Sequence, residues 1–444
     1  MILSRQELRL LLPLGTALAL SLTGDSTLYA VLPNQLAVVG ISLGAVGVML
    51  GANRIIRIPG NLVAGALNDR LGRKRLYLVG LSLGILSTVS YSFVHGFWLL
   101  LAARLLWGIA WALINVGGYA MVLDWSTSAN RGRMTGFYQV AYMVGLSISP
   151  ILGGTLTDVL GFRTAVRICA AVSAIGLAVA FVALPDVRPP AAEPPKVTVQ
   201  PNPRRWPRAL AGFLRRIDRR ILLAGYIYLT IFFVSNGVLM STVSLYLGQR
   251  WGTSISLGKV VIGVSSLAGV MLALRASLGI LGGPVAGILS DRLGNRWPVA
   301  RVAILVGVAG FVTLATARGI GAVPAGVALV SLSAGALIAV LAAVVGDLAA
   351  GNRSGITMGG MATAGDIGSA TGPLFAYALA SALDLRWVYL LCAVLLASCL
   401  LATLGSRRLG QAQATQQEPG AGRAEHSIPA GFVEGSSEPE PEGS

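Results

Sequence analysis

The chain is poor in charged residues, in cysteine and in histidine. Only 12% of its 444 residues are charged, against about 25% in an average soluble protein. Its 3 cysteines and 2 histidines stand without the spacing of metal ligands. The sequence also lacks a phosphate-cradling loop and a nucleophile–base set. We therefore expect no metal, no cofactor, no ATP-driven step and no enzyme activity.

Long apolar runs fill most of the sequence, each long enough to cross a hydrocarbon layer of about 30 Å. Twelve such runs occur, at about 10–33, 41–68, 76–94, 97–124, 134–158, 164–184, 221–248, 260–290, 299–317, 321–347, 355–381 and 387–404. The first could be a cleaved signal peptide, but it lacks a convincing cleavage site and further runs follow it. The pattern predicts an all-α polytopic membrane protein with twelve transmembrane helices.

The net charge of +16 is distributed unevenly along the chain. Clusters of arginine and lysine occur in alternate loops, at 69–75, 130–133, 215–220 and 291–296, whereas the loops between them hold few. This asymmetry follows the positive-inside rule and predicts cytoplasmic N- and C-termini. Anionic lipid headgroups, not nucleic acid, are the expected partners of these charges. Paired arginines and short loops favour a bacterial inner membrane.

Two polar segments divide the chain. Residues 186–220 are rich in proline and then basic, which is typical of a cytoplasmic linker. Residues 405–444 turn polar and end in an acidic stretch, which predicts a disordered cytoplasmic tail. The expected domains are therefore two six-helix bundles at 1–185 and 221–404, the linker at 186–220 and the tail at 405–444.

The two predicted bundles resemble each other in sequence. "IPGNLVAGALNDRLG" at 58–72 and "ILGGPVAGILSDRLG" at 280–294 share 10 of 15 positions, at an offset of about 222 residues. "GLSISP" at 145–150 and "GSATGP" at 368–373 recur at nearly the same offset. Duplicated six-helix halves predict a substrate site between them and access that alternates from one side of the membrane to the other.

Three motifs carry a family resemblance over residues 1–404. "GALNDRLGRKR" at 65–75, "RLLWG" at 104–108 and "GLSISPILGG" at 145–154 are similar to motifs of the major facilitator superfamily. Trp107 stands where that family often has glutamine, and Ser149 replaces a glycine. The chain resembles in particular the twelve-span drug/metabolite–proton antiporters, which implies a proton-coupled exporter.

The resemblance also implies a conformational latch on the cytoplasmic side. Asp69 would brace one half-helix end against another, Arg73 would pair with Asp124, and the second half would repeat the device. The implied latch residues are Asp69, Arg70, Gly72, Arg73, Asp124, Asp291, Arg292 and Asp347. The alternative is that these charges serve only topology and lipid contact.

Arginines within the apolar runs need a reason to be there, because one charge at mid-bilayer costs about 2.5–3.5 kcal/mol or more. Arg54 and Arg57 share a helical face with Asn61, and Arg275 lies at similar depth. The deep carboxylates are Asp25 and Asp366, which we expect to meet an arginine of the second run and Arg275, respectively. Asp25 and Asp366, with Arg104, are candidates for proton coupling. A static salt bridge is the alternative.

An excess of deep arginines favours an anionic or zwitterionic substrate, whereas the antiporter motif favours lipophilic or cationic drugs. Polar and aromatic residues of several runs are candidates for the substrate cavity, although ordinary helix packing would also explain single aromatic residues. The cavity candidates are Arg54, Arg57, Asn61, Trp107, Trp111, Asn115, Tyr138, Tyr142, Tyr226, Asn236 and Arg275. Candidate hinge or close-packing positions are Gly145, Pro150, Gly153, Gly154, Gly372 and Pro373.

Together these features predict a monomeric secondary transporter that exports drug-like or amphipathic small molecules in exchange for protons. One alternative keeps the fold and makes the chain a proton symporter or facilitator for organic anions or sugars. Another, from a different class, is a membrane sensor that does not transport. Its expected partners are a small-molecule substrate, protons and membrane lipids.

Overall fold

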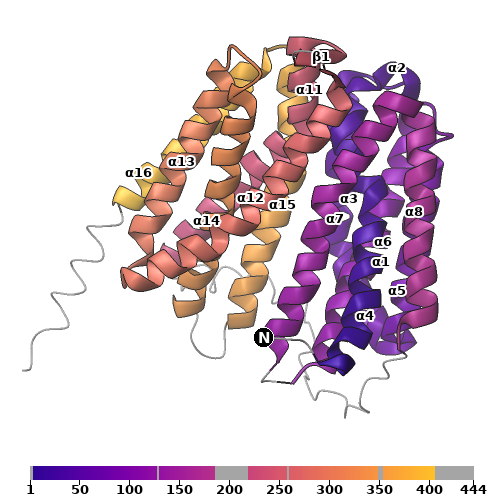
Figure 1. The fold of residues 1–444 in the computed structure, drawn as a ribbon. Coiled ribbons are helices and arrows are strands. Elements are labelled where there is room, and N and C mark those ends of the chain that lie inside the picture. Colours follow the sequence, from indigo (N-terminus) through magenta and orange to yellow (C-terminus); the bar gives the residue numbers. More distant parts are fainter. Residues whose placement is uncertain (1–3, 128–129, 186–218, 258–259, 349–353, 406–444) are drawn as a thin grey trace, which may run out of the picture. The chain divides into compact units, whose positions relative to one another are not determined.

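Helices account for almost all of the structure, a computed structural model that describes residues 4–127, 130–185, 219–257, 260–348 and 354–405 (Figure 1). Met1–Thr403 form one compact unit. The predicted linker and tail lie almost entirely outside the described residues. The division of the chain into 1–185, 186–220, 221–404 and 405–444 therefore stays a proposal.

The first half consists of helices joined by short turns. They are α1 (Arg5–Val31), η1 (Leu32–Asn34), α2 (Leu36–Val39), α3 (Leu43–Ile55), α4 (Arg57–Leu71), α5 (Arg73–Tyr91), α6 (Phe97–Trp125), α7 (Arg131–Leu160) and α8 (Phe162–Ala183). The apolar run at 41–68 is thus two helices rather than one. Pro59 explains the break, because a proline ring clashes with the carbonyl four residues earlier, here that of Ile55, where α3 ends.

The second half repeats this order with one irregular helix and one hairpin. Its elements are α10 (Arg219–Ile231), the π-helical η2 (Phe232–Leu239), α11 (Met240–Trp251), β1 (Ser254–Leu257), β2 (Val260–Gly263), α12 (Val264–Arg292), α13 (Arg296–Thr316), α14 (Ala322–Leu348), α15 (Ser354–Ala380) and α16 (Leu385–Gly405). The strands pair antiparallel, with Ser254 opposite Gly263. Neither the hairpin nor the π-helical stretch was expected from the sequence.

The predicted all-α membrane architecture is confirmed apart from that hairpin. With α3–α4 and α10–η2–α11 each taken as one rod, the helices longer than one turn in the described residues form twelve rods. In the described part of the chain, eight helical segments are long and apolar enough to cross a membrane by length and composition. The short lengths of α3 and α4, 13 and 15 residues, follow from the break between them.

The rods have two distinct ends. We call the end that holds α2 and the β1–β2 hairpin the hairpin end, and the opposite end, where Arg73 and Arg296 begin α5 and α13, the basic end (Figure 1). The N-terminus of α1 lies at the basic end, since Glu7 contacts Asn130 and Arg133 at the start of α7. These names carry no assignment to a side of the membrane.

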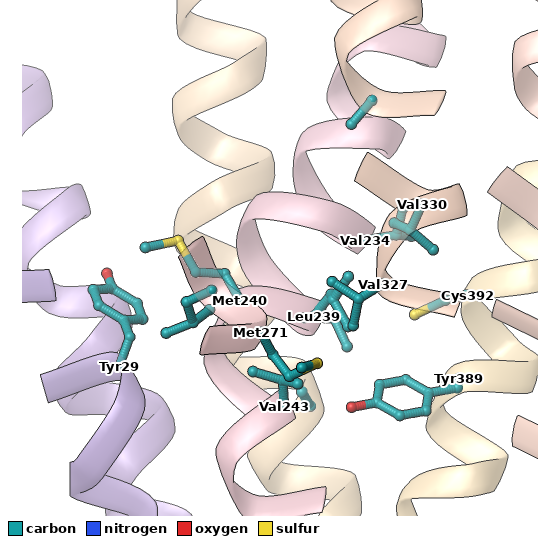
Figure 2. Packing of buried hydrophobic residues seen from close by; sticks show 14 of the residues in the cluster. Tyr29, Val234, Leu239, Met240, Val243, Met271, Val327, Val330, Tyr389 and Cys392 are labelled. Carbon is teal, nitrogen blue, oxygen red and sulfur yellow. The ribbon is translucent and has the colours of Figure 1, made fainter. Parts of the chain in front are cut away.

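One large hydrophobic cluster joins the halves. It contains residues of α1, such as Tyr29, and residues of the second half, such as Met240, Met271 and Tyr389. Figure 2 shows Tyr29 beside Met240 at this boundary. A second cluster, which includes Leu14, Tyr77, Trp107 and Tyr138, lies within the first half.

The halves meet through two mirrored helix pairs, α7 with α12 and α3 with α15. Gly154 of α7 lies against the backbone carbonyl of Ser265, and Gly47 of α3 against that of Pro373. A side chain at either glycine would overlap those carbonyls, so both contacts need glycine. Asn34, which donates to the Ser244 carbonyl at 3.2 Å, adds a further bond between the halves. These contacts all lie toward the hairpin end, where they hold the two halves together.

Candidate functional site

Asp25 and Arg104 form a buried ion pair in the first half. Arg104 Nη1 lies 2.5 Å from Asp25 Oδ1, and Asn53 Nδ2 donates to the same oxygen at 3.1 Å. Arg104 is 0% exposed and Asp25 6%. Within the described residues, no donor contacts Asp25 Oδ2. One carboxylate oxygen is thus held by two donors, while the other accepts no hydrogen bond from the described residues.

Further neighbours hold Arg104 in place. Its Nε donates to the Met49 carbonyl at 2.9 Å, its Nη1 lies 3.4 Å from Tyr91 Oη, and its guanidinium lies 5.9 Å from the centre of the Tyr29 ring. The predicted partner of Asp25 was an arginine of the second run, and that pairing is not found. Asp25 is buried, but the sequence did not indicate which helix faces it.

Arg54 and Arg57 instead contact neutral groups. Arg54 Nε donates to Tyr29 Oη at 3.3 Å, and its Nη2 reaches Met240 Sδ of the second half at 3.5 Å. The Arg57 guanidinium lies 5.1 Å from the centre of the Trp111 ring, and its buried Nε has no hydrogen-bond partner within the described residues. Neutral acceptors orient a guanidinium without cancelling its charge.

Arg275 supplies a third such cation from the second half. Its Nη2 donates to Asn236 Oδ1 and lies 3.5 Å from Ser235 Oγ. Both acceptors belong to the π-helical η2, and such stretches are frequent at functional sites. The predicted contact between Arg275 and Asp366 is not found. Asp366 is half-buried and forms no ion pair with the described residues, although it lies within electrostatic range of Arg54 and Arg57.

The structure separates the other cavity candidates into three groups. Trp111 and Tyr142 lie beside Arg57, with ring centres 5.5 Å apart, and Asn61 and Asn115 are half-buried on α4 and α6. Trp107 and Tyr138 are fully buried in the cluster of the first half. Tyr226 is 42% exposed and shares a hydrogen bond of 2.7 Å with Ser398. Trp107 Nε1 and Tyr138 Oη have no hydrogen-bond partner within the described residues, and Tyr226 lies on an exposed face.

The latch candidates of the first half lie at the basic end. Arg73 Nε contacts Asp124 Oδ2 at 2.5 Å, and Nη2 reaches Oδ1 at 3.4 Å, so α5 is tied to the end of α6. Gly72 joins α4 to α5 with φ +90°, a conformation that favours glycine. Arg70 is exposed. The side chain of Asp69 lies outside what the structure describes.

The second half repeats this pair with a residue that was not predicted. Arg296, rather than Arg292, contacts Asp347 at 2.6 Å and Asp291 at 3.3 Å. Arg292 is exposed. Arg296 corresponds to Arg73 at an offset of 223 residues rather than 222, and this small shift hid the correspondence. A cavity of about 410 Å³ lies beside these groups, lined also by Arg220 and Trp297.

The hinge candidates are sites of close helix approach. Gly145 and Gly153 of α7 lie against Ala19 and Thr27 of α1, while Gly154 lies against α12. In the second half, Gly372 lies against Gly237 of η2. Both α7 and α15 continue through their prolines, Pro150 and Pro373.

Glu7 organises a polar cluster that the sequence did not reveal. It completes a capping box with Ser4 and accepts bonds from Asn130 Nδ2 at 2.8 Å and from Arg133 Nη2 at 2.5 Å. The backbone bond from Ser4 and the bond from Arg133 lower the pKa of Glu7 from 4.5 to about 2. The start of α1 is thereby tied to the start of α7. Among the described residues, no His, Cys, Asp and Glu cluster could hold a metal ion.

Comparisons with known proteins agree with this architecture. The sequence model of the Major Facilitator Superfamily matches residues 14–281 and 234–434. An uncharacterised MFS-type transporter of Mycobacterium tuberculosis is 27% identical over 297 residues, which cover 66% of this chain and 37% of that protein. Multidrug resistance protein 1 of Bacillus subtilis is 29% identical over 144 residues, 32% of this chain and 37% of that protein. This chain thus spans well under half the length of each of these curated relatives.

A solved structure shows the fold independently. A bacterial homolog of the human lysosomal transporter Spinster, in an inward-facing and unoccupied conformation, has a TM-score of 0.73 with 15% sequence identity, covering 91% of this chain and 98% of that chain. At this identity the likeness concerns the fold alone. With the family match across most of the sequence, the chain belongs to the Major Facilitator Superfamily, a family of transporters, and is an integral membrane protein.

Proposed function

We propose that this chain is a secondary transporter that exports small organic molecules in exchange for protons. The observation that carries the proposal is the buried pair of Asp25 and Arg104, with Asn53 on the same carboxylate oxygen. A proton on Asp25 would remove the charge that holds Arg104, whereas its loss would restore the pair. A group with these two states can couple protonation to a rearrangement of α1, α3 and α6.

Alternating access is supported by the position of the contacts between the halves. Those contacts close the hairpin end, and the helix α4 has no extensive contact with the second half among the described residues. The placement of arginine and lysine supports the hairpin end as the outer side and the basic end as the cytoplasmic side. The described conformation would then be one that is closed to the outside.

Export is supported by the glycine–proline pattern of α7 and by the relative named as a multidrug resistance protein. A symporter or facilitator for organic anions or sugars would use the same fold and the same pair in the opposite direction. A sensor would have no need for coupled proton movement. A static pair that only joins α1 to α6 is the alternative role for Asp25 and Arg104.

The test separates coupling from substrate movement. Proteoliposomes that contain the full chain are assayed in two modes: accumulation driven by an imposed pH gradient, and exchange of labelled for unlabelled substrate without a gradient. The probes are calcein, an anionic dye, and ethidium, a cationic dye. The variants are Asp25→Asn, Asp25→Glu and, as a matched control on an exposed carboxylate, Asp384→Asn.

The expected result is that Asp25→Asn abolishes gradient-driven accumulation but retains exchange. Asp25→Glu keeps a carboxylate that can titrate and should retain part of the driven transport, while Asp384→Asn should match the unaltered chain. Gradient-driven transport that survives undiminished in Asp25→Asn would remove Asp25 as the proton carrier. If Asp25→Asn loses both transport modes and also unfolds at a lower temperature, the result would favour the static pair.

A further inference from the structure

The charges near the boundary between the halves do not balance. Arg104 occupies the carboxylate of Asp25, and no carboxylate in the described residues forms an ion pair with Arg54, Arg57 or Arg275. Among the described residues, Asp366 is the one further deep carboxylate, and it lies in electrostatic range of Arg54 and Arg57 without forming an ion pair with them. We call Arg54, Arg57 and Arg275 the central arginine group. The central arginine group carries three positive charges, and in the described part of the chain Asp366 is the carboxylate near it that is not already paired with Arg104.

The central arginine group is positioned but not neutralised. Tyr29 and Met240 hold Arg54, and Asn236 and Ser235 hold Arg275, all through uncharged atoms. Nε of both Arg57 and Arg275 is buried without a hydrogen-bond partner among the described residues. A buried N–H without an acceptor is unfavourable, because it has lost its hydrogen bond to water. Guanidinium donors with this geometry fit a carboxylate, sulfonate or phosphate oxygen.

The group draws on both halves of the molecule. Arg54 and Arg275 each lie 11 residues beyond the first residue of their helix, which places both about 16 Å below the hairpin end. Their charges act on each other. Arg54 also bridges the boundary through Met240. An anion between them would therefore contact both halves and lower the repulsion between these two cations.

Aromatic rings flank the same group. Tyr29 lies 5.8 Å from the Arg54 guanidinium, and Trp111 lies 5.1 Å from that of Arg57 and packs against Tyr142. Rings next to guanidinium groups offer a flat apolar surface beside a positive charge. A ligand with an anionic group and a flat apolar body would match both features.

We propose that the transported molecule is an amphipathic organic anion whose anionic group is held by Arg54 and Arg275, with the ring of Trp111 against its apolar body. This inference rests on the proposed transport function and names the substrate class. It departs from the cationic drugs that the glycine–proline motif alone favours. An anionic lipid headgroup has the same chemistry as the anionic end of such a molecule, so the test includes both sources.

Binding is measured on the full chain in detergent, where no proton gradient is needed. The probes share one ring system and differ in charge: 2-naphthoate, neutral 2-naphthamide and cationic 2-naphthylmethylammonium, each followed by titration calorimetry. A short-chain phosphatidylglycerol is the lipid probe. The variants are Arg54→Gln and Arg275→Gln, with Arg386→Gln as the control, because Arg386 is an exposed arginine at the start of α16.

We expect 2-naphthoate to bind and the cation not to bind. Arg54→Gln and Arg275→Gln should each weaken 2-naphthoate about tenfold to a hundredfold, the loss expected for one charge-assisted hydrogen bond, while Arg386→Gln should leave it unchanged. Equal or tighter binding of the cation would overturn the proposal. Binding of phosphatidylglycerol without 2-naphthoate would assign the group to a lipid and overturn it as well.

The outcomes of the two proposals can be told apart. If the chain transports a cation and this transport depends on Asp25, proton coupling is supported and the anionic substrate is refuted. If the chain binds 2-naphthoate selectively but its transport does not depend on Asp25, the anionic substrate is supported and the role of Asp25 is refuted. Affinity for 2-naphthoate that is unchanged in both arginine variants would also refute the role of the central arginine group.

Discussion

An Asp158→Ala substitution removes a carboxylate that α7 of the first half contributes to the first turn of α12 in the second half. Asp158 Oδ2 accepts the backbone N–H of Ser266 at 2.7 Å and its hydroxyl at 2.6 Å. Ser266 is the third residue of α12, and the first N–H groups of a helix have no partner within it. Gly263 lacks the side chain that would overlap the carboxylate. Asp158 thus caps a helix across the boundary between the halves.

The size of the effect follows from these two bonds. A side chain that caps a helix N-terminus contributes about 0.5–2 kcal/mol, and the charge adds about 0.3–1 kcal/mol near an exposed N-terminus. Because Asp158 is exposed, we take about 1–2 kcal/mol in total, which corresponds to roughly a fivefold to thirtyfold change in an equilibrium. Loss of the carboxylate should shift the chain by this factor toward states in which the hairpin end is open.

A buried cysteine at the same contact can report that shift. Ser265 is 3% exposed and its carbonyl touches Gly154, so a Ser265→Cys variant should react with maleimide only when α7 and α12 separate. The native Cys169, Cys392 and Cys399 are buried and should give a low background. While the open state is a minor one, the labelling rate is proportional to its population.

The labelling rate in the Ser265→Cys background should rise about fivefold to thirtyfold on adding Asp158→Ala. Ser266→Ala, which removes the hydroxyl bond and keeps the N–H bond, should give a smaller rise. Thr155→Ala is the matched control, because Thr155 bonds only to carbonyls of its own helix. A rate that is unchanged by Asp158→Ala, or raised equally by Thr155→Ala, would refute the cross-half cap.

Three further predictions concern the basic end and the helix contacts. Glu7→Gln should lower the thermal unfolding temperature in detergent at pH 7 but not near pH 2. The pKa of Glu7 in the folded chain is about 2, below the ordinary 4.5, so its stabilisation is lost as the pH falls from 4.5 to 2. A difference between the two chains that does not depend on pH would contradict this. Asp124→Asn should lower the unfolding temperature more than Asp347→Asn. The side chains of Arg73 and Asp124 are each 17% exposed, whereas Asp347 is 60% exposed, and exposed ion pairs contribute at most about 1 kcal/mol. Equal decreases in the unfolding temperature would contradict this prediction. Gly154→Val should prevent α7 and α12 from closing on each other and raise maleimide labelling at the hairpin end, whereas unchanged labelling would show that the contact is dispensable.

The sequence predicted the layout of the fold because its signals are local. Apolar runs long enough to span a bilayer and clusters of basic residues depend only on neighbouring positions, and the repeat at about 222 residues compares two such local stretches. They led to twelve rods in two related halves. The break at Ile56 has a signal in the sequence, because Pro59 lies four residues beyond the end of α3. The run at 41–68 was nevertheless predicted as one helix, because it is one continuous apolar run.

The site was less predictable because depth along a helix does not determine which helix faces a residue. Asp25 was placed correctly among the deep groups, yet its partner is Arg104 of α6, and the arginines of α3 and α4 bind neutral atoms instead. Arg275 contacts Asn236 in the π-helical η2, and a wider helical turn changes which side chain faces inward. No pattern in the sequence indicated that stretch.

The mirrored contacts at the hairpin end also bear on how the halves could separate. Gly154 against Ser265 and Gly47 against Pro373 are contacts between a glycine and a backbone carbonyl, and Gly47 also lies against the Cβ atom of Tyr377. Separation of the halves would expose part of the hydrophobic cluster that joins them, so it costs apolar burial as well as these close contacts. Polar contacts between the halves add to this burial, and among the described ones Asp158 contributes a charge. An anion between Arg54 and Arg275, which come from opposite halves, would act on the same balance from about 16 Å away along the helices.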